Sequence, residues 1–309
     1  MILDIGVALF HERFPIDPHL FASQVFIELN KNKVDKIVCL VQDADKVQMG
    51  LVAGIRDGML LSPFSAPFGG FHLKNDNIYT GAIESFINDL IEYAKVEKLK
   101  SIKITLPPDI YSQSFNAKII NVVYRLGLNM LTPEITNWVD LDQFQNIYTH
   151  PASRTYYNQS VKKGLSFFIV DNIKEKELIY NLIVDNRARM GRSIYMTFND
   201  LIDTGKIFPA DYFKVVKPTG EMVAAAIFYR HNKEIPYAVF WGDAEEGRSE
   251  RAMDFLIFQL WSFYKNAGGR FVDLGISTES SIPNEGLLRF KETHESTSSL
   301  RYTFTWSAS

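Results

Sequence analysis

The sequence predicts an α/β (α+β) protein made of two domains. The chain has 309 residues, which is more than one hydrophobic core usually accommodates. Strand-like apolar runs alternate with amphipathic helical segments, and this order begins again after a polar stretch at residues 142–152. We therefore expect an N-terminal domain at residues 1–145 and a C-terminal domain at residues 146–309.

The first half carries alternating strand and helix signals. Asp17-Pro18 is typical of a helix start, and Gly127 of a helix end. Asp57-Gly58 is typical of a hairpin turn between two strands. These signals predict strands at residues 1–13, 36–42, 49–56, 59–61, 101–106 and 136–141, and helices at residues 19–30, 80–98 and 115–126.

Residues 62–71 read SPFSAPFGGF and break this pattern. Two prolines and two glycines in ten residues exclude regular structure, and three phenylalanines argue against a polar surface loop. One interpretation is the wall of a substrate groove shared with the second domain, with Phe64 and Phe68 contacting the ligand. The other is a buried connection that binds nothing.

The second half repeats the order of the first: a helix, a strand hairpin, a long helix, and a strand that runs into a loop. This repetition predicts a structural duplication. The expected helices lie at residues 153–163, 174–190, 199–204, 249–266 and 284–292, and the expected strands at residues 165–170, 211–217, 221–230, 235–241, 271–274 and 300–306.

Composition and missing motifs exclude several functions. The six histidines show no metal-ligand spacing such as HExxH, so we expect no metal. GxSxG, GxxxxGK[ST] and a strand-linked GxGxxG are also absent, which removes hydrolase, P-loop and Rossmann chemistry. The net charge of −3 provides no overall field that would attract DNA.

Cysteine usage and hydropathy bear on the compartment. Cys39 is the single cysteine and lies in the apolar run KIVCLV, so it is expected to be buried, in a protein of a reducing compartment. No transmembrane segment is expected, because no apolar run approaches the length that spans a bilayer. The N-terminus lacks the basic region of a signal peptide. We therefore expect a cytoplasmic protein.

Two segments are candidates for binding anions. Arg187, Arg189 and Arg192 cluster at the end of the long helix, with Tyr195 nearby, and guanidinium groups match phosphate oxygens. The alternative is that these cations only complement the helix dipole. The segment WGDAEEGRSERAMDFL runs from a strand into a helix, where backbone N–H groups favour anions, and it offers a second candidate site at Gly247, Arg248 and Ser249. An ordinary capped helix is the alternative there.

The chain resembles the FemAB and BioF2-like tandem GNAT acyltransferases, which include the peptidoglycan-bridge aminoacyltransferases. The resemblance rests on MLLSPFSAPFGGF and KITLPPDIY in the first half, and on AAAIFYR, FVDLGIS and NEGLLRFKE in the second. It implies two tandem GNAT-like domains, each a mixed twisted sheet flanked by helices. It also implies transfer of an acyl or aminoacyl group from a thioester or ester donor to an amine of a cell-envelope precursor or sugar.

The resemblance also suggests site residues and partners. In relatives the lysine of the Phe-Lys pair lies near the reacting groups, which makes Lys291 the candidate catalytic residue, with Asp273 and Ser277 orienting it or the acceptor amine. Acyl-CoA is the expected donor, and aminoacyl-tRNA ranks below it because the chain is mildly acidic. The acceptor would be a small molecule or a lipid-linked sugar or peptide.

A second hypothesis is a non-catalytic binding or scaffold protein that keeps the GNAT fold. Residues 248–253 contain no glycine where GNAT acetyltransferases carry (Q/R)-x-x-G-x-(G/A), and this departure favours that hypothesis.

Overall fold

The computed structural model describes residues 1–309 except 44–46, 132, 231–233 and 309. The chain forms two compact units, and both take residues from near the C-terminus. Unit 1 comprises Met1–Ile135, Glu279–Ile282 and Ser299–Ser309, and unit 2 comprises Thr136–Thr278 and Pro283–Ser298. The observed division therefore differs from the predicted boundary at residues 145 and 146.

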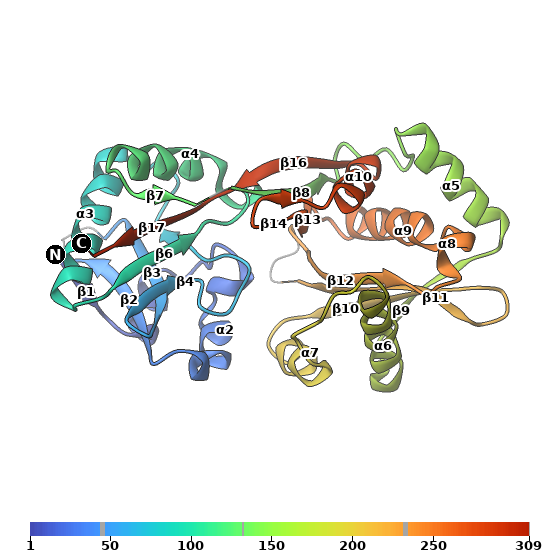
Figure 1. The fold of residues 1–309 in the computed structure, drawn as a ribbon, viewed down its shortest axis with the longest axis horizontal. Coiled ribbons are helices and arrows are strands. Elements are labelled where there is room, and N and C mark those ends of the chain that lie inside the picture. Colours follow the sequence, from blue (N-terminus) through green and yellow to red (C-terminus); the bar gives the residue numbers. More distant parts are fainter. Residues whose placement is uncertain (44–46, 132, 231–233, 309) are drawn as a thin grey trace. The chain divides into compact units, whose positions relative to one another are not determined.

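Unit 1 is built on a mixed sheet with the strand order β1-β2-β3-β4-β6-β17-β7, and β5 pairs with β3 (Figure 1). β4 and β6 run parallel, and the other pairs of this sheet are antiparallel. The strands are β1 Ile2–Asp4, β2 Lys36–Gln42, β3 Met49–Arg56, β4 Met59–Ser62, β5 Phe71–Leu73, β6 Ser101–Thr105, β7 Asn129–Met130 and β17 Thr303–Ser307.

Helices cover both faces of this sheet. Val38 and Leu40 on β2 face a core that also contains side chains of the two long helices, whereas Cys39 and Val41 face a second core beneath the short N-terminal helices. The alternation follows from the period of two along a strand. Cys39 is buried, as predicted. The helices are α1 Val7–Arg13, α2 Gln24–Leu29, α3 Thr80–Val96 and α4 Asp109–Arg125, with 3-10 turns at η1 Leu20–Ala22 and η2 Lys31–Lys33.

Unit 2 is built on a sheet with the order β16-β8-β13-β12-β11-β10-β9. In this sheet β9 to β12 form an antiparallel meander, and β13 runs parallel to β12. The strands are β8 Glu134–Asp140, β9 Ser166–Val170, β10 Ala210–Val216, β11 Met222–Tyr229, β12 Tyr237–Asp243, β13 Phe271–Ile276 and β16 Ser296–Arg301; β14 Thr278–Glu279 and β15 Ile282–Pro283 form a separate pair.

The helices of unit 2 also lie on both faces of its sheet (Figure 1). Leu256, Leu260 and Trp261 on α9 are fully buried in the main core, and α5 packs against α9. Ile179 and Ile183 on α6 are fully buried against the opposite face. The helices are α5 Pro151–Lys162, α6 Ile173–Arg189, α7 Phe198–Gly205, α8 Gly247–Glu250, α9 Ala252–Asn266 and α10 Glu285–Thr293.

The two units repeat one arrangement and exchange one strand. In each unit an antiparallel meander leads through a long helix to a parallel strand, β4-α3-β6 in unit 1 and β12-α9-β13 in unit 2. The next place in the sheet is taken by β17 in unit 1 and by β8 in unit 2. Each sheet is thus extended by a strand that is distant in sequence from its neighbour in the sheet.

Two predicted elements of the first half were wrong. The strand expected at residues 1–13 ends at Asp4, because Asp4 Oδ1 accepts hydrogen bonds from the N–H groups of Gly6 and Cys39, and α1 follows. The helix expected at residues 19–30 is interrupted at Ser23, whose extended backbone and side chain cap α2 instead.

One predicted strand of the second half is divided. Residues 300–306, expected to form one strand, contribute to both β16 and β17.

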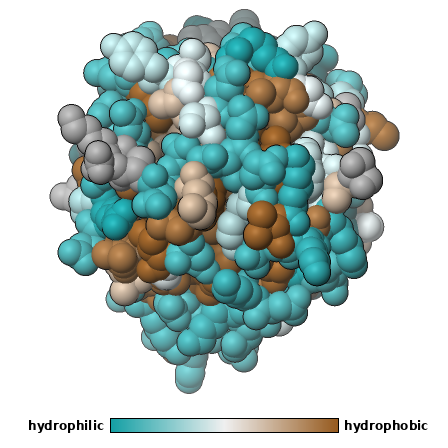
Figure 2. Space-filling model, turned by 90° about the vertical axis from the view of Figure 1, so that its left-hand side faces the viewer, coloured by the Kyte–Doolittle hydropathy of each residue, from teal (hydrophilic) through white to brown (hydrophobic). Residues whose placement is uncertain are grey.

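The surface of one side of the molecule is mainly hydrophilic, with separate apolar patches between polar side chains (Figure 2). Within the described residues, no helix has both the length and the apolar character needed to cross a bilayer.

The exchanged strand β17 contributes Phe304 to the core of unit 1, where its side chain is 1% exposed. We expect Phe304→Ala to lower the free energy of unfolding by about 3–5 kcal/mol, because the substitution leaves a cavity. Thr305→Ala, on the opposite face of the same strand, should cost much less. Urea unfolding of both variants checks this, and equal losses would show that β17 does not complete this core.

Candidate functional site

Unit 2 contains a cavity of about 710 Å³ beside the end of β12. Its wall comes from the last turn of α6, the residues that follow it, the start of α9 and one side of α10. Of the described residues that line it, five are arginines and two are aspartates: Arg187, Arg192, Arg248, Arg251, Arg289, Asp243 and Asp254. This balance of charges suits an anionic ligand.

The cavity begins where β12 separates from its parallel neighbour. The register joins Tyr237 of β12 to Asp273 of β13, near the start of β12. Residues 241–243 at the other end of β12 line the cavity. Gly247 follows directly and is buried, and a Cβ there would lie 2.4 Å from the carbonyl oxygen of Val223. The absence of a side chain at Gly247 therefore lets the chain turn tightly into α8.

The start of α9 presents backbone donors to the cavity. α9 begins at Ala252 after Arg251, which has a left-handed backbone conformation with φ of 56°, and no described side chain caps this helix. Ala252, Met253 and Asp254 line the cavity. Uncapped N–H groups carry the positive end of the helix dipole, so this end of α9 favours a negative ligand.

The arginines are held in defined positions. The Arg251 guanidinium lies 3.7 Å from the centre of the Tyr156 ring, at cation–π distance. Burial, together with the nearby charge of Arg192, lowers the pKa of Arg187. A lowered pKa means that the protonated form of Arg187 is less stable at this position than in water. A bound anion would stabilise the protonated form.

Asp243 is a buried carboxylate in the wall of the cavity. Asn186 Nδ2 donates to Asp243 Oδ1 at 2.7 Å and to its carbonyl oxygen at 3.0 Å. Burial raises the pKa of Asp243, although Arg248, Arg189 and Asn186 oppose this effect. A carboxylate with a raised pKa is better suited to accept a proton than an exposed one.

Asp254 and His294 form a second polar pair. His294 Nε2 lies 3.1 Å from Asp254 Oδ1, and Nδ1 lies 2.6 Å from the carbonyl oxygen of Phe290. A carbonyl oxygen can only accept, so Nδ1 carries the hydrogen of this bond. The pair joins the start of α9 to the end of α10 across the cavity wall.

Lys291 on α10 is 2% exposed and does not point into solvent. Its Nζ donates to the carbonyl oxygens of Leu274, Gly275 and Ile276, each at 2.9 Å. Burial lowers the pKa of Lys291 to about 7, against the opposing charge of Asp273, and Arg187 adds to the lowering. Because an ammonium has three N–H groups, these carbonyls occupy all of its donors.

Asp273 and Ser277 shape the same end of β13. The pairing of β13 with β8 shifts register between Asp273 and Ile276, and Gly275 in this bulge has φ of 65°. Asp273 Oδ1 accepts a hydrogen bond from Gly275 N at 2.8 Å. Ser277 Oγ donates to Asn137 Oδ1 at 2.5 Å. The three predicted catalytic residues, Lys291, Asp273 and Ser277, therefore lie close together. They stabilise the bulge of β13 and do not line the cavity.

Comparison with solved structures reveals the same architecture in other proteins. The crystal structure of FemX matches with a TM-score of 0.71 and 13% sequence identity, over 100% of this chain and 97% of FemX. L-PGS from Bacillus licheniformis matches with a TM-score of 0.59 and 13% identity, over 96% of this chain and 90% of L-PGS. A tandem GNAT protein from the clavulanic acid biosynthesis pathway matches with a TM-score of 0.55 and 13% identity, over 100% and 98% of the two chains. The chain has the tandem GNAT fold.

This result confirms the predicted fold class and the predicted likeness to FemAB-type tandem GNAT proteins. No protein-family model and no curated protein sequence matches the chain significantly. The relationship is therefore visible in the fold, where the GNAT architecture covers nearly the whole chain.

The tandem GNAT fold brings some predicted binding residues together and separates others. Arg187, Arg192, Gly247 and Arg248 all line the cavity, although they come from two distant segments. Three other predicted residues do not line it. Arg189 donates to the backbone carbonyl of Asp243, Tyr195 is 95% exposed, and Ser249 Oγ donates to the carbonyl of Glu246.

The two phenylalanines predicted for substrate binding belong to unit 1. Phe68 is 1% exposed and packs with His19 and Phe21 in an aromatic cluster. Phe64 lines a cavity of only about 20 Å³. This volume is close to that of one water molecule. The predicted groove shared with the second domain stays a prediction.

Sequence reasoning missed several residues of the cavity. Arg251, Asp243 and Asp254 lie in the segment that was recognised as an anion site, and the strand-to-helix transition there was the available signal. Arg289 and His294 lie on or directly after α10, next to the Phe-Lys pair. No spacing rule connects these two segments, because tertiary packing alone brings α10 to α9.

The pKa of Lys291 predicts a pH dependence of stability. Because the folded pKa of about 7 lies below the ordinary value of 10.5, the unfolded chain keeps its proton at pH values where the folded chain has lost it. The free energy of unfolding should therefore rise between about pH 7 and 10.5 by up to about 1.4 kcal/mol per pH unit. Lys291→Met removes this contribution. Urea unfolding of both proteins at pH 7 and pH 9 measures it, and parallel profiles would mean that the three carbonyls keep the ammonium charged.

Proposed function

We propose that the protein is an acyl- or aminoacyltransferase that moves an acyl group from a thioester or ester donor to an amine. The observation that carries this proposal is the cavity of about 710 Å³ in unit 2, with its five arginines and the uncapped start of α9. It lies at the separation of β12 from β13 in a fold shared with FemX and a tandem GNAT protein.

The charge of the cavity supports a donor that carries phosphate groups. Guanidinium groups bind phosphate oxygens in a planar two-pronged geometry, and a helix N-terminus adds backbone N–H donors. Acyl-CoA carries its phosphates at the far end of the pantetheine arm from the thioester, and aminoacyl-tRNA carries phosphates along its backbone, so both donors offer anionic groups to such a cavity. We favour acyl-CoA, because the chain carries a net charge of −3 and tRNA binding usually needs a large basic surface.

The residues present suit direct transfer without a covalent enzyme intermediate. The acceptor amine would attack the acyl carbon, the bond to the leaving sulfur or oxygen would break, and the amine proton would pass to a nearby base. Asp243 is our candidate for this base, because it is buried in the cavity wall and has a raised pKa.

Lys291, Asp273 and Ser277 take a positioning role in this proposal. The three carbonyl groups that bind Lys291 Nζ leave no N–H for a substrate. These residues keep β13 apart from the end of β12 and fix α10, which supplies Arg289 and Phe290 to the cavity.

The acceptor that we propose is a small molecule or a lipid-linked sugar or peptide with a free amine, as in cell-envelope precursors. FemX and L-PGS are the structural neighbours that motivate this choice. The test is to incubate the protein with acetyl-CoA, longer acyl-CoAs or charged tRNA, together with UDP-linked amino-sugar peptides, and to measure release of thiol or tRNA and the acylated product by mass spectrometry.

A non-catalytic binding protein with the GNAT fold is the second candidate. It is favoured by the burial of Asp273, Ser277 and Lys291 within structural hydrogen bonds. Thermal-shift measurements detect ligand binding in both cases, and the assay for acylated product distinguishes the two candidates. A ligand at one hundred times its dissociation constant adds about 2.7 kcal/mol of stability to either protein. Binding of acyl-CoA with no product from any amine acceptor would support the binding protein.

We expect Arg187→Gln and Arg192→Gln each to weaken CoA binding by about 10- to 100-fold, since a charge-assisted hydrogen bond contributes about 1.5–3 kcal/mol. Arg270→Gln is the control, because Arg270 pairs with Asp140 and does not line the cavity. Isothermal titration calorimetry measures all three. Equal affinity in every variant would leave these arginines only a role at the end of α6.

We expect Asp243→Asn to reduce kcat by about 10²- to 10⁴-fold while acyl-CoA affinity stays within a few fold, because the amide cannot take the amine proton. The rate should also lose its dependence on the ionisation of this carboxylate. A pH–rate profile of the variant that matches the unaltered protein would contradict the role of Asp243 as base.

A further inference from the structure

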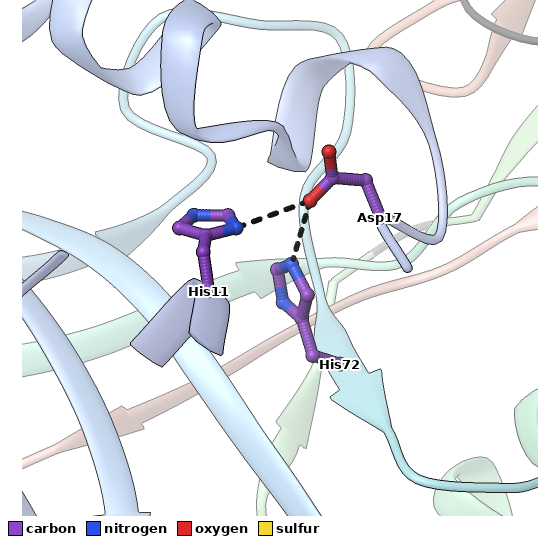
Figure 3. A group of neighbouring side chains, drawn as sticks. All are labelled: His11, Asp17 and His72. Carbon is purple, nitrogen blue, oxygen red and sulfur yellow. Dashed lines mark ion pairs between the residues drawn. The ribbon is translucent and has the colours of Figure 1, made fainter. Parts of the chain in front are cut away.

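Unit 1 contains a cluster of two imidazoles and one carboxylate outside the site described above. Asp17 Oδ1 lies 3.2 Å from His11 Nδ1 and 3.8 Å from His72 Nε2, and the three side chains converge (Figure 3). One ligand-type atom from each residue lies within 4.8 Å of the others. Ligands bound tetrahedrally to zinc at 2.0–2.1 Å lie about 3.3 Å apart, which matches the distance from Asp17 to His11 and is shorter than the distance from Asp17 to His72, so His72 would move slightly toward a bound ion.

The cluster is buried and its polar atoms are not satisfied. The side chains of His11, Asp17 and His72 are 10%, 22% and 0% exposed. Within the described part of the chain, Asp17 Oδ1, His11 Nε2 and both ring nitrogens of His72 lack a hydrogen bond of normal geometry. Buried polar groups are paired in most proteins, because an unpaired one costs about 1–3 kcal/mol. Two imidazoles and a carboxylate that converge with these four atoms lacking a hydrogen bond of normal geometry offer ligand atoms to a cation.

Three separate segments position the cluster. His11 lies on α1, Asp17 lies in the turn before η1, and His72 lies on β5, opposite Gly50 of β3. Phe10 packs edge-on against the His72 ring at 4.8 Å between centroids, and Phe14 lies at 5.9 Å. The aromatic contacts and the strand pairing restrict the His72 ring, so its nitrogens cannot turn to solvent for hydrogen bonds.

We propose that His11, Asp17 and His72 form a binding site for a divalent transition-metal ion, with Zn²⁺ as the first candidate. Imidazole nitrogen and carboxylate oxygen are ordinary ligands of Zn²⁺, and the partial exposure of Asp17 leaves room for water as a further ligand. The site is independent of the acyltransferase proposal, since the proposed transfer uses only residues of unit 2.

A bound ion would link α1 and the turn after it to β5. These segments are distant in sequence, so the metal would stabilise the folded form of unit 1 over the unfolded chain. The sequence could not reveal this site, because 5 residues separate His11 from Asp17 and 54 separate Asp17 from His72, and these spacings match no known ligand motif.

The test uses the full chain without a histidine tag, stripped of metal by a chelator. Co²⁺ is titrated first, and a visible d–d absorption that saturates at one equivalent is the expected result. Zn²⁺ should displace the Co²⁺, and competition with a chromophoric chelator then measures the Zn²⁺ affinity. Thermal unfolding with and without Zn²⁺ provides a second readout that needs no enzyme activity.

Asp17→Asn keeps the size of the side chain and removes the charge, and His72→Gln removes an imidazole. Each should lower the Zn²⁺ affinity by at least about 100-fold, because even residues that only support metal ligands contribute 10- to 100-fold. Asp57→Asn, at an exposed turn of the same unit, is the control and should bind Zn²⁺ normally. If His72→Gln does not fold, Asp17→Asn alone decides. No stoichiometric binding by the folded protein, or unchanged affinity in Asp17→Asn, would overturn the proposal.

Discussion

The separation of β12 from β13 is the constraint on which unit 2 depends. The two strands are in register at Tyr237 and Asp273, and beyond this point β13 needs other partners for its backbone groups. Asp273 Oδ1 accepts a hydrogen bond from the N–H of Gly275, and Lys291 Nζ donates hydrogen bonds to the carbonyl oxygens of residues 274–276. Buried backbone groups without partners would be costly, so these side chains stabilise β13 where it separates from β12 inside the sheet. The same contacts fix α10, which forms one wall of the cavity.

The separation of β12 from β13 explains why charged side chains lie together around the cavity. The end of β12, the start of α9 and the end of α6 meet around the cavity, and each brings polar groups that a closed sheet would have excluded. Asp243 and Asn186 satisfy each other there, whereas the arginines have no comparable set of carboxylates. The arginines in the cavity wall are the physical basis of the proposal that a phosphate-bearing acyl donor binds there.

Each candidate site lies within one unit, although the sheets of both units contain strands from distant parts of the chain. β17 completes the sheet of unit 1, and β8 extends the sheet of unit 2, so both sheets depend on residues far away in sequence. The cluster of His11, Asp17 and His72 nevertheless lies entirely in the first 72 residues, and the arginine-lined cavity lies entirely in unit 2. A metal ion bound by the His11, Asp17 and His72 cluster would stabilise unit 1, whereas the proposed acyl transfer would take place in the cavity of unit 2.

The sequence alone determined the element order, the fold class and much of the anion site, because each depends on local pattern. Apolar runs predicted β2 and β3 with their observed bounds, and the strand-to-helix segment after Trp241 indicated Gly247 and Arg248. Tertiary structure decided what local pattern cannot encode. It directed Lys291 Nζ to three carbonyl oxygens, buried Phe68 in an aromatic cluster, and left Tyr195 exposed. It also exchanged β8 and β17 between the sheets and brought His72 to His11, because strand pairing and side-chain packing join residues that no short spacing connects.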